Sequence, residues 1–95
     1  MYLQEADRED IKDYIEGEDF NGYILGTVEN GGTLLFIVVE GTPQNMTVVV
    51  GVYDDDFNFK VTHARGANFK FTGDWDALFC YLESEMAKYH NISYQ

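Results

Sequence analysis

The sequence has few basic residues and a single cysteine. Its 95 residues hold 6 Lys and Arg against 17 Asp and Glu, so the formal net charge at pH 7 is −11. A chain this acidic does not bind nucleic acid through the phosphates and does not dock on anionic lipid. The lone Cys80 cannot form an internal disulfide. It adjoins an apolar helical stripe, and we expect it to be a small buried hydrophobic residue rather than a nucleophile.

Long hydrophobic runs are also missing. The longest apolar stretches, residues 34–39 and residues 48–53, the second broken by Gly51, are far shorter than the roughly 20 residues that a membrane span needs. The first residues lack the basic start and the apolar stretch of a secretory signal peptide. We therefore expect a cytoplasmic protein with no membrane contact.

No complete catalytic, metal or cofactor motif occurs. The two histidines, His63 and His90, have no partner at His-x-x-x-His spacing, and there is no Cys-x-x-Cys pair. The Gly-x-Ser-x-Gly and Gly-x-x-x-x-Gly-Lys signatures are absent as well. We expect no enzyme, no cofactor and no specific metal site. If a ligand pocket exists between the sheet and the second helix, His63 and Arg65 are its candidate polar groups.

The chain nevertheless has enough apolar material for a core. Hydrophobic residues make up 45% of it and aromatic residues 16%, which is unlike the composition of disordered chains. A length of 95 residues allows one domain, and we expect residues 1–95 to form it.

The hydrophobic periodicity predicts a single α+β domain in the order α-β-β-β-β-β-α. We expect an acidic N-terminal helix at about 5–16, a sheet at about 20–72 and an amphipathic C-terminal helix at about 74–90, with Asp74 as its N-cap. The strands are expected at 20–28, 33–40, 46–53, 57–63 and 69–72, with a turn at 64–68. Their short links favour antiparallel pairing. The C-terminal helix should then pack on one face of the sheet.

The acidic residues gather in two places. Residues 1–19 hold eight acids against Arg8 and Lys12, and three more stand together in 54–56. The triple aspartate lacks the ligand spacing of a calcium-binding EF-hand loop, so we expect no specific metal there. Asp74 and Asp76 suit a helix N-terminus better than acid–base catalysis.

The N-terminal helix is expected to carry a row of carboxylates. Glu5, Glu9, Asp13 and Glu16 follow one side of it, and each four-residue step rises about 6 Å. Phosphates along one DNA strand advance about 3.4 Å per nucleotide, so such a row can imitate a phosphate backbone approximately. The expected partner-binding residues are Glu5, Glu9, Asp10, Asp13, Glu16, Glu18, Asp19, Asp54, Asp55 and Asp56.

These features favour a small acidic inhibitor that occupies the cationic, nucleic-acid-binding groove of a target enzyme. The expected partner is thus a basic protein that handles nucleic acid. In size and charge the chain looks like phage-encoded inhibitors of restriction, CRISPR or DNA-repair enzymes, of the anti-defence type; this likeness is one of composition and assigns no residue. The alternatives are an immunity or antitoxin protein, a structural adaptor including a homodimer, and a small-ligand-binding domain. The charge can also serve solubility alone.

Overall fold

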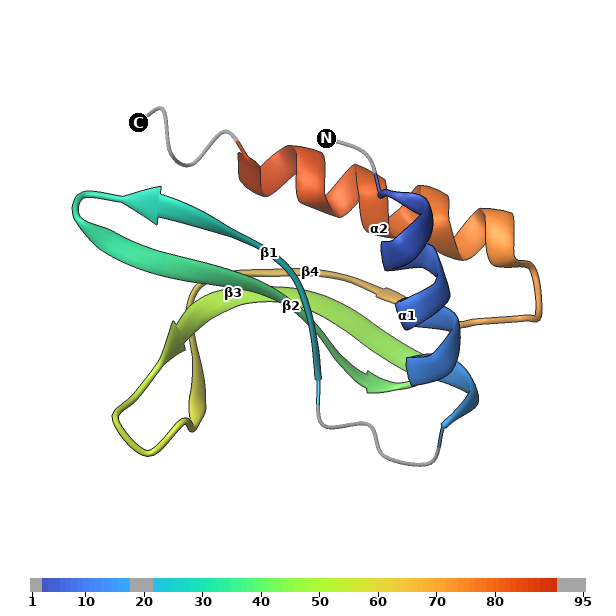
Figure 1. The fold of residues 1–95 in the computed structure, drawn as a ribbon, viewed down its shortest axis with the longest axis horizontal. Helices are drawn as coiled ribbons and strands as arrows, with labels where there is room; N and C mark the ends of the chain where they lie inside the picture. Colours follow the sequence, from blue (N-terminus) through green and yellow to red (C-terminus); the bar gives the residue numbers. More distant parts are fainter. Residues whose placement is uncertain (1–2, 18–21, 91–95) are drawn as a thin grey trace.

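The computed structural model describes residues 3–17 and 22–90 and shows an α+β fold. Four antiparallel strands form one sheet in the order β1-β2-β3-β4, and both helices lie on the same side of it (Figure 1). The α+β class and the antiparallel sheet that the sequence predicts are confirmed. The elements in chain order are α1 (Glu5–Glu16), β1 (Tyr23–Asn30), β2 (Thr33–Thr42), β3 (Asn45–Tyr53), β4 (Phe59–Phe69) and α2 (Trp75–His90).

Both helices begin at a capped N-terminus. At α1 the backbone N–H of Gln4 donates to the Asp7 carboxylate at 3.1 Å, which fixes the entry of the chain. At α2 the N–H of Ala77 donates to the Asp74 carboxylate at 3.2 Å, so the predicted N-cap at Asp74 is confirmed. Neither helix in the described part of the chain is long and apolar enough to cross a membrane.

The core lies between the helices and one face of the sheet. Alternate residues of β2 and β3 point toward the helices and are buried there: Leu35, Ile37, Val39, Met46, Val48 and Val50. Ile11 and Ile15 of α1 and Leu78, Leu82 and Met86 of α2 complete this core. We call the opposite side, which no described helix covers, the open face of the sheet.

The structure has four strands where the sequence predicts five. The strand β4 covers most of the strand expected at 57–63, continues through the turn expected at 64–68 and ends at Phe69, so the separate strand expected at 69–72 is not formed. Two register shifts against β3, at Thr47/Val49 and at Val50/Gly51, let β4 bend without turning back. Beyond the strand, the N–H of Phe71 still donates to the carbonyl of Pro43 at 2.8 Å.

Gly66 explains why the turn prediction failed. The sequence treats this glycine as a turn residue, but it lies inside β4 against the carboxylate of Glu85 and the hydroxyl of Tyr89. A Cβ atom at this position would collide with the Glu85 carboxylate. The glycine therefore allows the Glu85 side chain of α2 to lie close to β4, a contact that local sequence does not reveal.

Cys80 is exposed, so the prediction of a buried thiol is wrong. Its neighbours Leu78, Phe79 and Leu82 are buried on the face of α2 that packs on the core. Each residue of a helix is rotated by about 100° from the last, so a residue beside an apolar stripe can already face solvent.

Candidate functional site

Five carboxylates cover the outer side of α1. They are Glu5, Glu9, Asp10, Asp13 and Glu16, and all five are exposed; we call them the acidic face. At about 100° per residue they fall within one arc, opposite the side on which Ile11 and Ile15 are buried. The structure thus brings together five of the predicted partner-binding residues on one surface.

Both cations of α1 are directed toward α2. The guanidinium of Arg8 lies 3.2 Å from the Glu83 carboxylate and 5.2 Å from the centre of the Phe79 ring. The ammonium of Lys12 lies 5.8 Å from the centre of the Trp75 ring and 3.9 Å from Glu9. These contacts hold the positive charge at the boundary with α2. The outer arc of α1 therefore carries five carboxylates, and among them Glu9 pairs with a cation of the same helix, Lys12.

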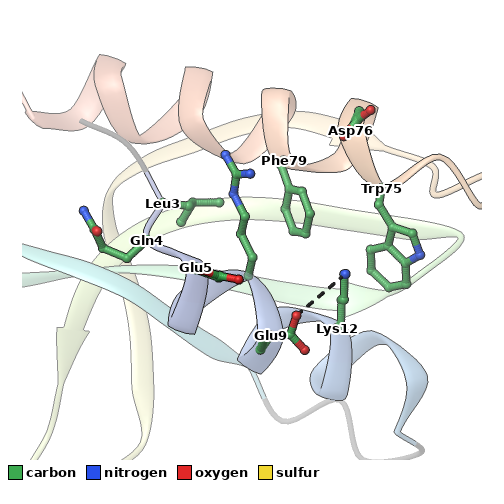
Figure 2. A pocket seen from close by; sticks show the side chains of 9 residues that line it. Leu3, Gln4, Glu5, Glu9, Lys12, Trp75, Asp76 and Phe79 are labelled. Carbon is green, nitrogen blue, oxygen red and sulfur yellow. Dashed lines mark ion pairs between the residues drawn. The ribbon is translucent and has the colours of Figure 1, made fainter.

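A groove of about 520 Å³ separates the two helices and borders the acidic face. Figure 2 shows the side chains of Phe79 and Trp75 reaching down from α2 toward α1, with Lys12 beside Trp75. Asp76, at the start of α2, points away from α1 (Figure 2). The groove is lined by Leu3, Gln4, Glu5, Arg8, Glu9, Lys12, Trp75, Asp76 and Phe79.

The negative potential of α1 extends to β1. Burial is the largest cause that raises the pKa of Tyr23, and the nearby carboxylates of Asp10 and Asp7 raise it further. The Tyr23 ring also lies 6.1 Å from the ring of Tyr14 on α1. Carboxylates of the helix therefore act on a group of the sheet edge beneath it.

The aspartate turn at residues 54–56 is not part of this surface. It links β3 to β4 at the end of the sheet remote from α1 (Figure 1). The Asp54 carboxylate accepts the backbone N–H groups of Asp56 and Asn58, each at 2.9 Å. The bond from Asn58 is the main reason that the pKa of Asp54 is lowered. Asp54 thus builds the turn, and all three aspartates are exposed. The remaining predicted residues, Glu18 and Asp19, lie outside the described residues.

His63 and Arg65, the candidate polar groups of the alternative pocket, contact different partners. The His63 ring lies 3.2 Å from the side-chain amide of Asn30, where the ends of the curled sheet approach each other. Arg65 pairs instead with Glu40 at 3.2 Å. Within residues 3–17 and 22–90, no three His, Cys, Asp or Glu side chains gather as a metal site.

Sequence reasoning missed the inward direction of Arg8 and Lys12. Both cations have acidic neighbours in the sequence, which suggests only that they neutralise part of the N-terminal negative charge. Trp75 and Phe79 belong to the amphipathic helix expected at about 74–90, and in the structure both line the groove and lie against these cations. Only the packing of α2 beside α1 reveals that these cations lie against the rings of α2.

No protein-family model, no curated protein and no solved structure matches this chain.

Proposed function

We propose that this protein is a small acidic binding protein that occupies a cationic, nucleic-acid-binding groove on a partner enzyme. The observation that carries the proposal is the separation of charge on α1. Arg8 and Lys12 lie against Phe79 and Trp75 of α2, and the outer arc is left with five exposed carboxylates. A surface kept only for solubility has no need of this separation.

The spacing of the acidic face supports contact with phosphate-binding side chains. Glu5, Glu9 and Asp13 advance by about 6 Å per step along a helix about 18 Å long. This step is close to twice the rise of about 3.4 Å per nucleotide of one DNA strand. Lysines and arginines arranged for alternate phosphates therefore find carboxylates at comparable intervals.

The mechanism of such a protein is competition. Its carboxylates pair with the cations that otherwise hold the phosphate backbone, so protein and nucleic acid exclude each other. The net charge of −11 steers association with a basic partner, and added salt slows it. The chain itself performs no catalysis, and the proposal places it in the cytoplasm with its target. The contact rests on α1, since the turn at 54–56 lies at the other end of the sheet.

The test compares the wild-type protein with the variant Glu5→Gln, Glu9→Gln, Asp13→Asn and Glu16→Gln. Each tagged protein is incubated with bacterial lysate at low salt and eluted first with DNA and then with high salt, and the eluates are read by mass spectrometry. We expect DNA to release a nucleic-acid enzyme from the wild type, and the variant to retain at most a tenth as much of it.

A charge-matched control distinguishes the effect of the acidic face on binding from the effect of net charge. Thr33→Lys, Gln44→Lys, Thr72→Lys and Ser84→Lys change four exposed positions outside α1 and shift the net charge by the same four units. This control should keep the DNA-released partner. If the neutralised variant retains the partner as well as the wild type does, or if both variants lose it equally, the acidic face is a solubility device and the proposal fails.

A further inference from the structure

The open face of the sheet carries an apolar hollow that the acidic face does not involve. It has a volume of about 390 Å³ and is lined by Ile24 of β1, Phe36 of β2, Tyr53 of β3 and Phe57 of the turn that follows β3. The rings of Phe36 and Tyr53 meet edge to face, with their centres 4.9 Å apart. Ile24 is 47% exposed and Phe57 is 85% exposed. This wall of apolar side chains is open to solvent.

Phe57 is held outward at a cost to the fold. Its φ angle of 62° lies in the left-handed region, where Gly and Asn are usual and a bulky side chain is strained. The turn is closed by the N–H of Phe57, which donates to the carbonyl of Asp54 at 3.0 Å. Gly or Asn would make the same bond without strain. A phenylalanine with a strained backbone and an 85% exposed side chain does not stabilise the fold, so its presence here calls for another reason.

The edge of the hollow beside Phe57 is acidic. Asp55 and Asp56 immediately precede Phe57 in the turn, and both are exposed. Neither forms an ion pair with a residue in the part of the chain that the structure describes. The hollow thus combines an apolar wall with two carboxylates at one edge, the pattern of an interface with an apolar anchor and a charged rim.

We propose that this hollow docks a basic segment of a partner protein. An aliphatic or aromatic side chain of that segment enters between Ile24, Phe36 and Tyr53, and Phe57 packs over it. Lysine or arginine residues flanking the anchor pair with Asp55 and Asp56. A second copy of this chain is a poor occupant, because it also carries a net charge of −11 and would bring a second aspartate turn to the same contact.

The test is a selection from random 12-residue peptides displayed on phage. Peptides are selected on the wild-type protein after removal of those that bind the Phe57→Asn variant. Asparagine accepts a positive φ, so this variant should fold and melt at a higher temperature than the wild type. We expect the selected peptides to share one aromatic or aliphatic residue flanked by Lys or Arg. Their Kd should rise at least tenfold on Phe57→Asn, as measured by isothermal titration calorimetry.

Two further variants locate the contact. Leu34→Thr removes another exposed apolar side chain, 51% accessible, that does not line the hollow, and it should leave the Kd unchanged. Asp55→Asn with Asp56→Asn should raise the Kd and weaken its dependence on salt. Failure to select peptides, selected peptides without basic residues, or equal binding to Phe57→Asn would each overturn the proposal. So would a concentration-dependent dimer in sedimentation that Phe57→Asn abolishes, because the occupant would then be a second copy.

Discussion

Among individual residues, Glu85 of α2 is a buried carboxylate that lies against Gly66 of β4. Its side chain is almost fully enclosed, with one carboxylate oxygen 3.0 Å from the Lys88 ammonium and the other 3.1 Å from the Tyr89 hydroxyl, which donates to it. Burying a carboxylate is costly unless it is paired and hydrogen-bonded, and both conditions are met here. The absence of a side chain at Gly66 provides the space for it.

The contact between Glu85 and Tyr89 predicts that the protein loses stability at high pH. Burial, followed by the charge of Glu85, raises the pKa of Tyr89 from 10.0 to about 12. Below pH 10 both the folded and the unfolded chain keep this proton, so the free energy of unfolding does not depend on it. Between pH 10 and 12 only the unfolded chain releases the proton, so the free energy of unfolding should fall as the pH rises. Urea titrations from pH 8 to 11.5 measure this slope.

The variant Tyr89→Phe tests the assignment. Its free energy of unfolding should fall less steeply above pH 10, although part of the slope should remain because burial also raises the pKa of Tyr81 and of Tyr23. The variant should be less stable than the wild type at pH 7, since Glu85 loses one hydrogen bond. A slope identical to that of the wild type would contradict the assignment of the raised pKa to Tyr89.

Among the secondary-structure elements, β3 and β4 are joined by a side chain as well as by their own backbones. At the first register shift between them, the Tyr81 hydroxyl accepts the Val48 N–H at 3.2 Å and donates to the carbonyl of Ala67. The hydroxyl thus bridges β3 and β4 at a point where the register shift interrupts the backbone hydrogen bonds between the two strands. The Tyr81 ring stacks on Phe69 with the ring centres 4.7 Å apart, which fixes its position.

Removing this hydroxyl should therefore weaken the sheet. Tyr81→Phe leaves the N–H of Val48, whose residue is fully buried, without a partner, and we expect the free energy of unfolding to fall by about 1–3 kcal/mol. Urea denaturation measures the loss, and amide exchange should show faster exchange at Val48. Tyr53→Phe is the matched control, because the Tyr53 hydroxyl makes no hydrogen bond to a described residue. If both variants lose the same stability, the bridge has no special role.

For the whole molecule, the dominant quantity is the net charge of −11 on a body with a radius of gyration of 13.0 Å. Many of its charges lie within a few Debye lengths of one another, so they repel at low ionic strength. Ion pairs that involve an exposed cation, such as Arg8–Glu83 and Arg65–Glu40, offset little of this repulsion.

Added salt should thus stabilise the fold while it weakens binding to a basic partner. Raising NaCl from about 0.02 M to about 0.5 M shortens the Debye length severalfold, and the melting temperature should increase. The four-lysine control described above should show a smaller increase, because less repulsion remains to be screened. Differential scanning calorimetry measures both proteins. A melting temperature that falls with salt in the wild type would show that favourable ion pairs outweigh the repulsion.

The sequence by itself determined the elements with a strong local signal. The helix over 5–16 coincides with α1, and Asp74 caps α2, because apolar spacing and capping act over a few residues. The antiparallel order followed from short links. Tertiary structure decided what depends on contacts distant in sequence. Glycine at 66 makes room for Glu85, so β4 continues where the sequence indicates a turn. Arg8 lies against the ring of Phe79 and Lys12 against the ring of Trp75, which are distant in the sequence, and only that packing directs both cations of α1 toward α2.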